Sequence, residues 1–248
     1  MTVCIYDNSS ALGKAAGTDA ADLIQSAIHS NGRANIILAT GTSQFETLDH
    51  LVDATGIDWH RVVMFHLDEY IGLPVNHPAS FRKYLQERFV SKASALEATY
   101  FIHGDEDPAR ECARLNKIMA EHEIDVALVG IGENGHLAFN DPPADFETED
   151  PFIVVELDEK CREQQLAEGW FKSIDEVPKK AISMSIKQIL KSKNIICSVP
   201  GARKAIAVKN CLEEAVSNLY PASVLQQHPN CTIYLDDLSA SLLSKNIA

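Results

Sequence analysis

The residues from Val126 to Asp141 read VALVGIGENGHLAFND, and this stretch decides the fold that we expect. Aliphatic side chains fill its first half, which is typical of a strand buried on both faces. Glycines then interrupt the pattern and let the backbone turn sharply or approach a ligand closely. Ligands bind at the carboxyl ends of strands in open α/β sheets. The stretch therefore predicts that His136 faces a ligand site, although a glycine-rich turn also occurs where nothing binds.

Further apolar segments of strand length occur on either side of this stretch, and helical patterns separate most of them. Such alternation favours a parallel sheet that is covered on both faces. We therefore expect an α/β protein in which residues 1–248 form a single domain around an open, doubly wound, mainly parallel, Rossmann-like sheet. The predicted strands are 3–6, 34–39, 61–67, 99–103, 124–132, 152–157, 195–199 and 231–235.

Two polar segments interrupt this regular order. The acidic residues 142–150 are loop-like and are our candidate for a flap over the site. Residues 158–176 have no clear periodicity, so the sequence does not predict their structure.

The composition excludes several classes of protein. With 46% hydrophobic and 23% charged residues the chain is typical of a globular protein, and its net charge of −13 argues against a nucleic-acid partner. We find no apolar run long enough to suggest a membrane span, and no amino-terminal hydrophobic run that resembles a signal peptide. Its six cysteines form no C-x-x-C pair, and its nine histidines are not spaced as metal ligands. We expect a cytoplasmic protein with reduced thiols and no metal site.

A loop of small residues, Thr40-Gly41-Thr42-Ser43, lies between a predicted strand and a predicted helix. Free backbone N–H groups and the helix dipole make this arrangement suitable for an anion, unless Thr42 or Ser43 simply caps the helix. The dipole contributes only about 0.3–1 kcal/mol, whereas a hydrogen bond to a charged group contributes about 1.5–3 kcal/mol. A dedicated phosphate site therefore requires a Lys or Arg from elsewhere.

Charged residues also follow two other predicted strands. Asp68 and Glu69 are neighbours, so at most one faces a pocket, while the other turns to solvent or caps a backbone group. A partly buried carboxylate is a common general base. Lys204 falls in the first turn of a predicted helix, where the dipole disfavours a cation. This position indicates an anionic partner for Lys204, unless the side chain is simply solvated.

Four blocks of the sequence together resemble the glucosamine-6-phosphate deaminase family, which belongs to a larger group with the 6-phosphogluconolactonases. The resemblance extends over nearly the whole chain, and it implies conversion of glucosamine 6-phosphate to fructose 6-phosphate and ammonia without a cofactor. The blocks are TGTS (40–43), LDEYIGLPVNHPASF (67–81), GIGENGHLAFNDP (130–142) and GARKA (201–205) with ASVLQQHP (222–229).

The resemblance also implies roles for single residues. His136 matches the histidine that opens the sugar ring, a step that imidazole suits because it exchanges protons near neutral pH. Asp68 matches the carboxylate that moves a proton between C2 and C1, with Glu69 as its neighbour. The loop Gly41-Thr42-Ser43 and Lys204 would hold the phosphate, and Lys204 would supply the cation that the loop lacks.

The sequence departs from the family at three positions. Family members often have an aspartate two residues before the histidine and a glutamate five residues after it, where this chain has Asn134 and Asp141. We expect the Asn134 amide to accept a hydrogen bond from the imidazole, and Asp141 to be the carboxylate that stabilises the imidazolium. The family's further phosphate-binding arginine is replaced by Gly169, and Arg162 is our candidate substitute.

The chain is shorter than the hexameric, allosterically regulated members of the family. We therefore expect a monomer or small homo-oligomer that N-acetylglucosamine 6-phosphate does not activate. Three alternatives stay open: a 6-phosphogluconolactonase, a galactosamine-6-phosphate isomerase and a catalytically silent sugar-phosphate sensor. The C2 base favours deamination over lactone hydrolysis, and Asn134 is the residue that favours a sensor.

Overall fold

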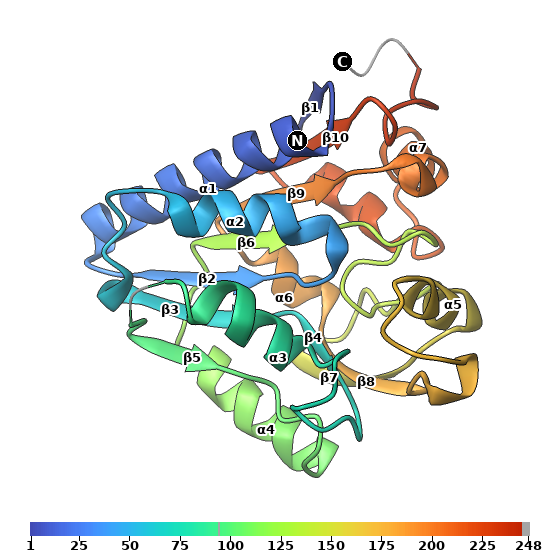
Figure 1. Cartoon of the computed structure of the whole chain (residues 1–248), viewed down its shortest axis with the longest axis horizontal. Coiled ribbons are helices and arrows are strands. Elements are labelled where there is room, and N and C mark those ends of the chain that lie inside the picture. The colour runs from blue at the N-terminus through green and yellow to red at the C-terminus, as the bar shows by residue number, and fades with distance from the viewer. Residues whose placement is uncertain (94, 245–248) are drawn as a thin grey trace.

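The computed structural model describes residues 1–93 and 95–244, and its centre is a seven-stranded parallel sheet (Figure 1). All neighbouring strands pair in parallel in the order β1-β10-β9-β6-β2-β3-β5. The predicted α/β fold with a mainly parallel sheet is therefore confirmed. The strands are β1 (Thr2–Tyr6), β2 (Ala34–Leu38), β3 (Val62–His66), β5 (Ala98–Tyr100), β6 (Val126–Val129), β9 (Asn194–Val199) and β10 (Cys231–Asp236).

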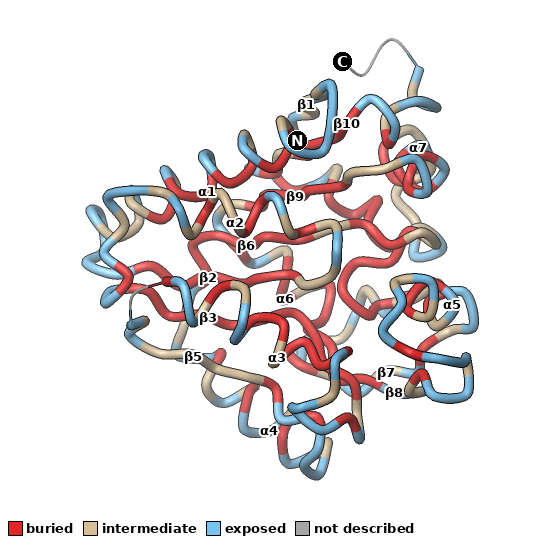
Figure 2. Tube along the Cα trace, in the orientation of Figure 1, coloured by how far each residue is buried: buried red, intermediate tan, exposed pale blue. Residues whose placement is uncertain are grey.

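The central strands are apolar because both of their faces are buried. Side chains alternate along a strand, so in β2 Ile37 enters one core while Ile36 and Leu38 enter the other. Helices cover both cores, and the sheet is buried along most of its length (Figure 2). One face carries α1 (Ser9–Asn31), α2 (Phe45–Asp53) and α3 (Phe81–Leu85), which a π-helical turn (Gln86–Val90) extends; the other carries α4 (Pro108–Met119), α6 (Ile186–Leu190), α7 (Ala205–Glu213) and a 3-10 segment (Pro221–Gln227).

Close packing of α1 against α2 sets the position of the loop before α2. A Cβ atom on Gly13 would lie 2.2 Å from Cβ of Glu46, and one on Gly17 would lie 2.8 Å from Cβ of His50. Glycine is required at both positions because any side chain would separate the helices. The N-terminal end of α2 is therefore held close to the carboxyl end of β2.

A second sheet, which the sequence analysis did not predict, lies beside the first. Its strands β4 (Asp68–Tyr70), β8 (Lys180–Met184) and β7 (Phe152–Glu156) pair antiparallel in the order β4-β8-β7. The chain leaves β3 at Leu67 and enters this sheet directly at Asp68. The predicted strand 152–157 therefore exists, but it belongs to the small sheet rather than to the parallel one.

The small sheet carries its own apolar cluster and the helix α5 (Glu159–Ala167). Tyr70, Phe81, Phe139 and Phe171 pack in this cluster, with ring centroids 5.0–5.7 Å apart for the pairs that Tyr70 forms with the other three. Because Phe139 follows the glycine-rich turn after β6, the cluster joins that turn to the small sheet. No helix among the described residues is long and apolar enough to cross a membrane.

Candidate active site

A cavity of about 470 Å³ opens at the carboxyl ends of β2, β3, β6 and β9. Its volume lies in the range of small-molecule sites, which is about 300–1,000 Å³. Residues from all four strand ends converge on it, as the parallel topology predicts. Of the residues that the sequence analysis selected, those that line the cavity are Gly41, Thr42, Ser43, Asp68, His136 and Lys204.

The glycine-rich turn after β6 presents the ring of His136 to the cavity. Gly135 has a φ of 87°, a conformation that favours glycine, and the N–H of Gly132 donates to the carbonyl of His136 at 2.9 Å. A Cβ atom on Gly132 would lie 2.2 Å from Nε2 of the imidazole. Glycine at this position therefore makes room for the ring, and Nε2 lies at the glycine turn.

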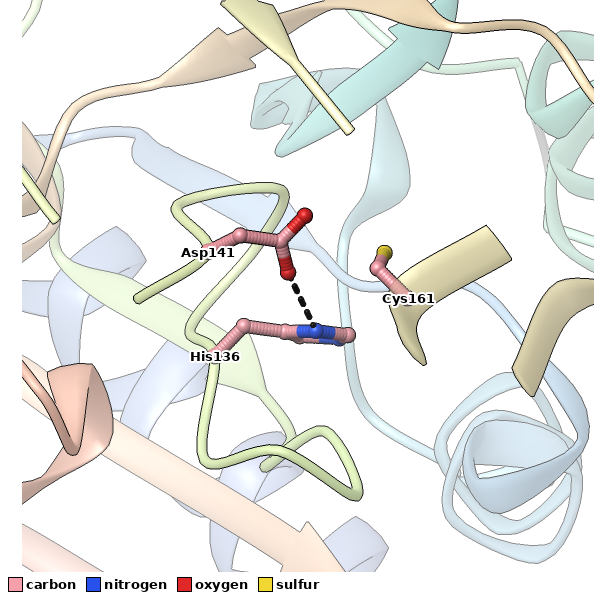
Figure 3. Close-up of side chains that lie close together, drawn as sticks. All are labelled: His136, Asp141 and Cys161. Atoms are coloured by element: carbon pink, nitrogen blue, oxygen red, sulfur yellow. Dashed lines mark hydrogen bonds and ion pairs between the residues drawn. The ribbon is translucent and has the colours of Figure 1, made fainter. Parts of the chain in front are cut away.

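A carboxylate orients the other nitrogen of the ring. Nδ1 of His136 lies 3.1 Å from Oδ1 of Asp141, and both side chains are largely buried (Figure 3). Burial raises the pKa of Asp141, but hydrogen bonds from His136, Asn134 and the backbone of Asp158 outweigh burial and leave the pKa below its usual value. Asp141 is thus an acceptor that places the imidazole proton on Nδ1 and leaves the lone pair on Nε2.

The amide of Asn134 has a different role from the expected one. Its Oδ1 accepts from the backbone N–H of His136 at 3.0 Å rather than from the imidazole. Its Nδ2 donates to Oδ1 of Asp141 at 2.9 Å and to Oδ2 of Asp158 at 3.2 Å. Neither Asn134 nor Asp141 lines the cavity, so both act on His136 from behind.

Asp68 and Glu69 point in opposite directions, as neighbours on a strand must. Asp68 lines the cavity with 7% of its surface exposed. Burial, followed by the charge of Glu69, raises its pKa well above the usual value. A carboxylate in such a position is a stronger base than one in water.

Glu69 is fully buried and caps α3 instead of facing the cavity. Its carboxylate accepts from Ser80 Oγ at 2.9 Å, from the N–H of Phe81 at 3.2 Å and from the N–H of Arg82 at 2.9 Å. Burial raises the pKa of Glu69, and these hydrogen bonds offset part of the rise. The expectation that one of the two carboxylates caps backbone groups is therefore confirmed.

Two loops of the same shape face each other across the turn after β6. After β2, Gly41 has a φ of 94° and is followed by a 3-10 turn (Thr42–Gln44) and then α2. After β9, Gly201 has a φ of 96° and is followed by a 3-10 turn (Ala202–Lys204) and then α7. Because β6 lies between β9 and β2 in the sheet, both helix N-termini are directed at one cavity. Two positive dipole ends make this side of the cavity suitable for an anion.

Lys204 supplies the positive charge on this side. Its side chain is 9% exposed. Burial lowers its pKa, while the charges of Glu133 and Glu168 act in the opposite direction. Burying a cation beside two helix N-termini is costly, and a bound anion would offset part of that cost.

Several other residues that the sequence analysis did not select also line the cavity, among them Arg203, Gln164, Gln165 and Glu168. Arg203 was detectable because it precedes Lys204 in the GARKA block, and its Nε lies 3.4 Å from Oε1 of Glu133. The other three belong to α5 and the turn after it, where most of the sequence is polar. Since this side of α5 faces a polar cavity, it has no apolar stripe that periodicity could detect.

The cover of the cavity is α5 rather than the acidic loop 142–150, none of whose residues line the cavity. Oε1 of Gln165 accepts from the hydroxyl of Tyr70 at 2.7 Å, and Oε1 of Gln164 accepts from the N–H of Glu133 at 2.9 Å. These bonds attach α5 to the small sheet and to the glycine-rich turn. The candidate flap therefore lies outside the site, and the segment without a pattern closes it.

The proposed substitute arginine does not reach the cavity. Arg162 donates from Nη2 to the carbonyl of Val177 at 3.1 Å and from Nε to the same carbonyl at 3.3 Å, and it also donates to the carbonyl of Ile174. It is absent from the lining, so it is not positioned as a phosphate ligand. Its bonds instead tie α5 to the segment before β8.

The carboxylate of Glu168 lies at the anion side of the cavity. A Cβ atom on Gly41 would lie 3.7 Å from its Oε2. Burial raises the pKa of Glu168, while a hydrogen bond from Gln164 and the charges of Lys204 and Arg203 lower it. A negative group therefore lies close to the loop that is otherwise the most suitable for an anion.

Comparisons with known proteins agree with this geometry. Residues 7–234 match the family described as glucosamine-6-phosphate isomerases/6-phosphogluconolactonase. The chain is 38% identical over 246 residues to a glucosamine-6-phosphate deaminase of Lactobacillus delbrueckii subsp. bulgaricus (98% of this chain, 100% of the relative). It is 36% identical over 249 residues to one of Lacticaseibacillus paracasei (99% and 100%).

Solved structures give the same result. A monomeric glucosamine-6-phosphate deaminase superposes with a TM-score of 0.90 at 33% identity and covers 98% of this chain and 100% of its own. A 6-phosphogluconolactonase from Trypanosoma brucei superposes with a TM-score of 0.80 at 18% identity, covering 98% of each chain. The second likeness extends to the fold alone.

Proposed function

The chain belongs to the family of glucosamine-6-phosphate isomerases and 6-phosphogluconolactonases, and we propose that it converts glucosamine 6-phosphate to fructose 6-phosphate and ammonia. One observation carries this proposal. Asp68 and His136 follow the ends of different strands, and both line the cavity that Lys204 and the loop around Thr42 (residues 40–43) also line. The cavity thus combines two groups that transfer protons with a side suited to a phosphate.

In the proposed mechanism the phosphate binds between the two helix N-termini, where the loop after Gly41 donates backbone hydrogen bonds and Lys204 supplies positive charge. Charge-assisted hydrogen bonds of this kind are about twice as strong as neutral ones. Fixing the phosphate orients the sugar so that C1 and C2 extend toward Asp68 and His136. Such positioning reduces the entropy that the proton transfers must overcome.

Ring opening is assigned to His136. Nε2 accepts the proton of the anomeric hydroxyl and returns a proton to the ring oxygen, which breaks the bond between C1 and that oxygen. The imidazolium that forms between the two steps keeps its Nδ1 proton directed at Asp141, whose carboxylate stabilises the positive charge. Asn134 holds that carboxylate in place.

The isomerisation is assigned to Asp68. Its carboxylate removes the proton from C2 of the open aldehyde, while the carbonyl oxygen at C1 takes up a proton that the ammonium group on C2 gives up. Asp68 then delivers the C2 proton to C1, which leaves an iminium at C2 and a hydroxyl at C1. Addition of one water molecule to C2 then releases ammonia and forms the C2 ketone. The raised pKa of Asp68 supports this role, because a base with a higher pKa removes a proton from carbon more readily.

Hydrolysis of 6-phosphogluconolactone is the alternative on this scaffold. That reaction needs a histidine to activate water, but it moves no proton at C2. The burial of Asp68 beside the cavity is costly for a lactonase and useful for an isomerase. The relatives above 30% identity are named as deaminases, which also favours deamination.

The test is to incubate the purified protein with glucosamine 6-phosphate and to measure ammonia and fructose 6-phosphate in equal amounts. Galactosamine 6-phosphate and 6-phosphogluconolactone are assayed in parallel. Acid released from the lactone without ammonia from the amino sugar would establish the lactonase instead. Binding of glucosamine 6-phosphate without either product would establish a sensor, and preference for the galacto sugar would change the substrate but not the mechanism.

The proposal includes a monomeric or small homo-oligomeric state. It is supported by the monomeric deaminase that superposes on the whole chain. Light scattering on the eluted protein should give about one chain mass of 27.3 kDa for a monomer. A hexameric mass, or activation by N-acetylglucosamine 6-phosphate, would contradict this part of the proposal.

A further inference from the structure

Three donor atoms meet behind the imidazole of His136, on the side away from the cavity lining. They are Nδ1 of His136, a carboxylate oxygen of Asp141 and Sγ of Cys161, and all lie within 4.8 Å of one another (Figure 3). His136 and Asp141 belong to the segment after β6, whereas Cys161 lies in the first turn of α5. The proposed mechanism uses the first two residues and leaves the thiol without a role.

Nitrogen, oxygen and sulfur donors together suit a particular class of metal. Mg²⁺ and Ca²⁺ take oxygen ligands, whereas Zn²⁺ accepts thiolate, imidazole and carboxylate in one site. Zinc bonds of about 2.0–2.3 Å in a tetrahedron separate the ligand atoms by about 3.3–3.8 Å. The pair from His136 to Asp141 is already at 3.1 Å. Because Sγ of Cys161 lies within 4.8 Å of both other atoms, a shift of at most about 1.5 Å would complete the geometry.

The charges and the surrounding hydrogen bonds also suit a divalent ion. One thiolate and one carboxylate neutralise Zn²⁺, which removes most of the cost of burying it. The ligands are held from outside: Oδ2 of Asp141 accepts from the N–H of Asp158 at 3.0 Å, and Oδ1 of Asp158 accepts from the N–H of Cys161 at 2.5 Å. Such outer hydrogen bonds commonly increase metal affinity about 10–100-fold.

We propose that one Zn²⁺ binds to Nδ1 of His136, the carboxylate of Asp141 and Sγ of Cys161, and that this ion inhibits the enzyme. Water completes the fourth position. The thiol proton is released to solvent, and the imidazole proton moves from Nδ1 to Nε2 because the metal takes the Nδ1 lone pair. No oxidation or reduction is involved.

The inhibitory effect rests on the proposed function. With zinc on Nδ1 and a proton on Nε2, the ring has no lone pair directed at the cavity, so it cannot accept a proton from the sugar. Asp141 at the same time becomes a zinc ligand and no longer stabilises an imidazolium. Binding of the ion and catalysis are therefore mutually exclusive.

The binding test uses the whole chain after treatment with a chelator, and it does not depend on activity. Calorimetric titration with Zn²⁺ should give one site per chain, and Co²⁺ in its place should give the absorption of a cobalt–thiolate bond. Cys161→Ala and the closer-sized Cys161→Ser should each weaken Zn²⁺ binding at least about 100-fold and abolish that absorption. Cys112→Ala, which removes a partly buried thiol from α4, is the matched control and should bind Zn²⁺ as the wild type does.

The inhibition test measures deamination at increasing Zn²⁺, relative to the metal-free rate of each variant. Zn²⁺ should inhibit the wild type and Cys112→Ala, a chelator should reverse the effect, and both Cys161 variants should resist it. Unchanged Zn²⁺ binding in both folded Cys161 variants, or tight binding without inhibition, would overturn the proposal. If the wild type released no ammonia at all, the proposed function would fail, while the titration would still decide whether the metal site exists.

Discussion

The two sides of the cavity are formed by different kinds of structural element. One side consists of the carboxyl ends of parallel strands, which carry the Thr42 loop, Asp68, His136 and Lys204. The other side is α5, which packs on the small antiparallel sheet and contributes Gln164, Gln165 and Glu168. The first side carries the groups that the proposed chemistry needs. The second side closes the cavity, and its Glu168 adds a negative charge near the loop that follows β2.

In this molecule the residues proposed for catalysis and the residues that cover the cavity therefore come from different structural elements. Each residue of the strand-end side lies in the segment that directly follows a buried strand of the parallel sheet, and a rigid strand fixes where that segment begins. The residues of the α5 side depend on a nine-residue helix that two glutamine hydrogen bonds attach to its neighbours. Substitutions on the first side should therefore change turnover or binding strongly, and substitutions on the second should change them less.

The largest effect is expected from Asp68→Asn. The amide has the same shape but cannot remove a proton from C2, so kcat should fall by at least about 10³-fold, within the range that general bases contribute. The dissociation constant of a non-reacting sugar phosphate should change little. A variant that retained more than a tenth of the wild-type rate would contradict the assignment of Asp68 as the base.

The next effect is expected from Gly132→Ala, which tests the space reserved for the imidazole. The added Cβ would lie 2.2 Å from Nε2 of His136, so the ring must move. Displacing a catalytic group by about 1 Å can reduce the rate about 10²-fold. Kinetics of Gly72→Ala supply the control, because Gly72 has free space around it and lies outside the cavity. Its φ of 81° is positive and that of Gly132 is not, so the control carries the larger backbone strain without any contact with the imidazole.

Lys204→Ala should mainly weaken binding. Loss of a charge-assisted hydrogen bond of about 1.5–3 kcal/mol corresponds to a KM about 10–100-fold higher, with a smaller change in kcat. Raising the salt concentration should reduce the difference between the two proteins only slightly, because the lysine is buried. If kcat fell and KM did not change, Lys204 would act on the reacting atoms rather than on the phosphate.

A smaller change of opposite sign is expected from Glu168→Gln on the α5 side. Removing a carboxylate near Gly41 should strengthen the binding of inorganic phosphate about twofold to fivefold, since partly exposed charge pairs contribute up to about 1 kcal/mol. Calorimetry on wild type and variant at the same pH measures this. Weaker binding in the variant would indicate that Glu168 helps to hold the ligand.

The smallest expected effect is that of Asp68→Asn on the thermal stability of the protein, and it depends on pH. The folded-state pKa of Asp68 is raised above its unfolded value, so its protonated form is favoured by folding. Its contribution to stability is present at acid pH and is lost as the pH rises through the raised pKa. At neutral pH Asp68→Asn should therefore increase Tm by about 2–4 °C, the shift that about 1 kcal/mol gives in a chain of this size.

The same titration predicts how activity depends on pH. The rate of the wild type should fall as the pH is lowered through the raised pKa of Asp68, because the protonated acid is not a base. This fall should begin at a higher pH than for an exposed aspartate. A rate that stays constant down to the usual pKa range of exposed aspartates would contradict the shift.

The contrast between the two sides also explains what could be predicted. Buried strands followed by glycines, paired carboxylates or small residues are local patterns, and such patterns made Gly41, Thr42, Ser43, Asp68, His136 and Lys204 candidates. The family resemblance implied that they share one site, and all six line one cavity. Strand geometry also predicted that only one of Asp68 and Glu69 would face the cavity. Asn134 and Arg162 were assigned wrong partners, because the partner of a side chain depends on segments distant in the sequence.

The sequence by itself determined the parallel α/β fold, the strand ends that meet and the residue types available for proton transfer and anion binding. It could do so because burial on both faces and the alternation of strand and helix are properties of neighbouring residues. Only the tertiary structure decided that three strands form a separate antiparallel sheet, that α5 covers the cavity and that Cys161 lies beside His136 and Asp141. These features depend on packing between residues far apart in the chain, and no local pattern in a polar helix reports which surface it will meet.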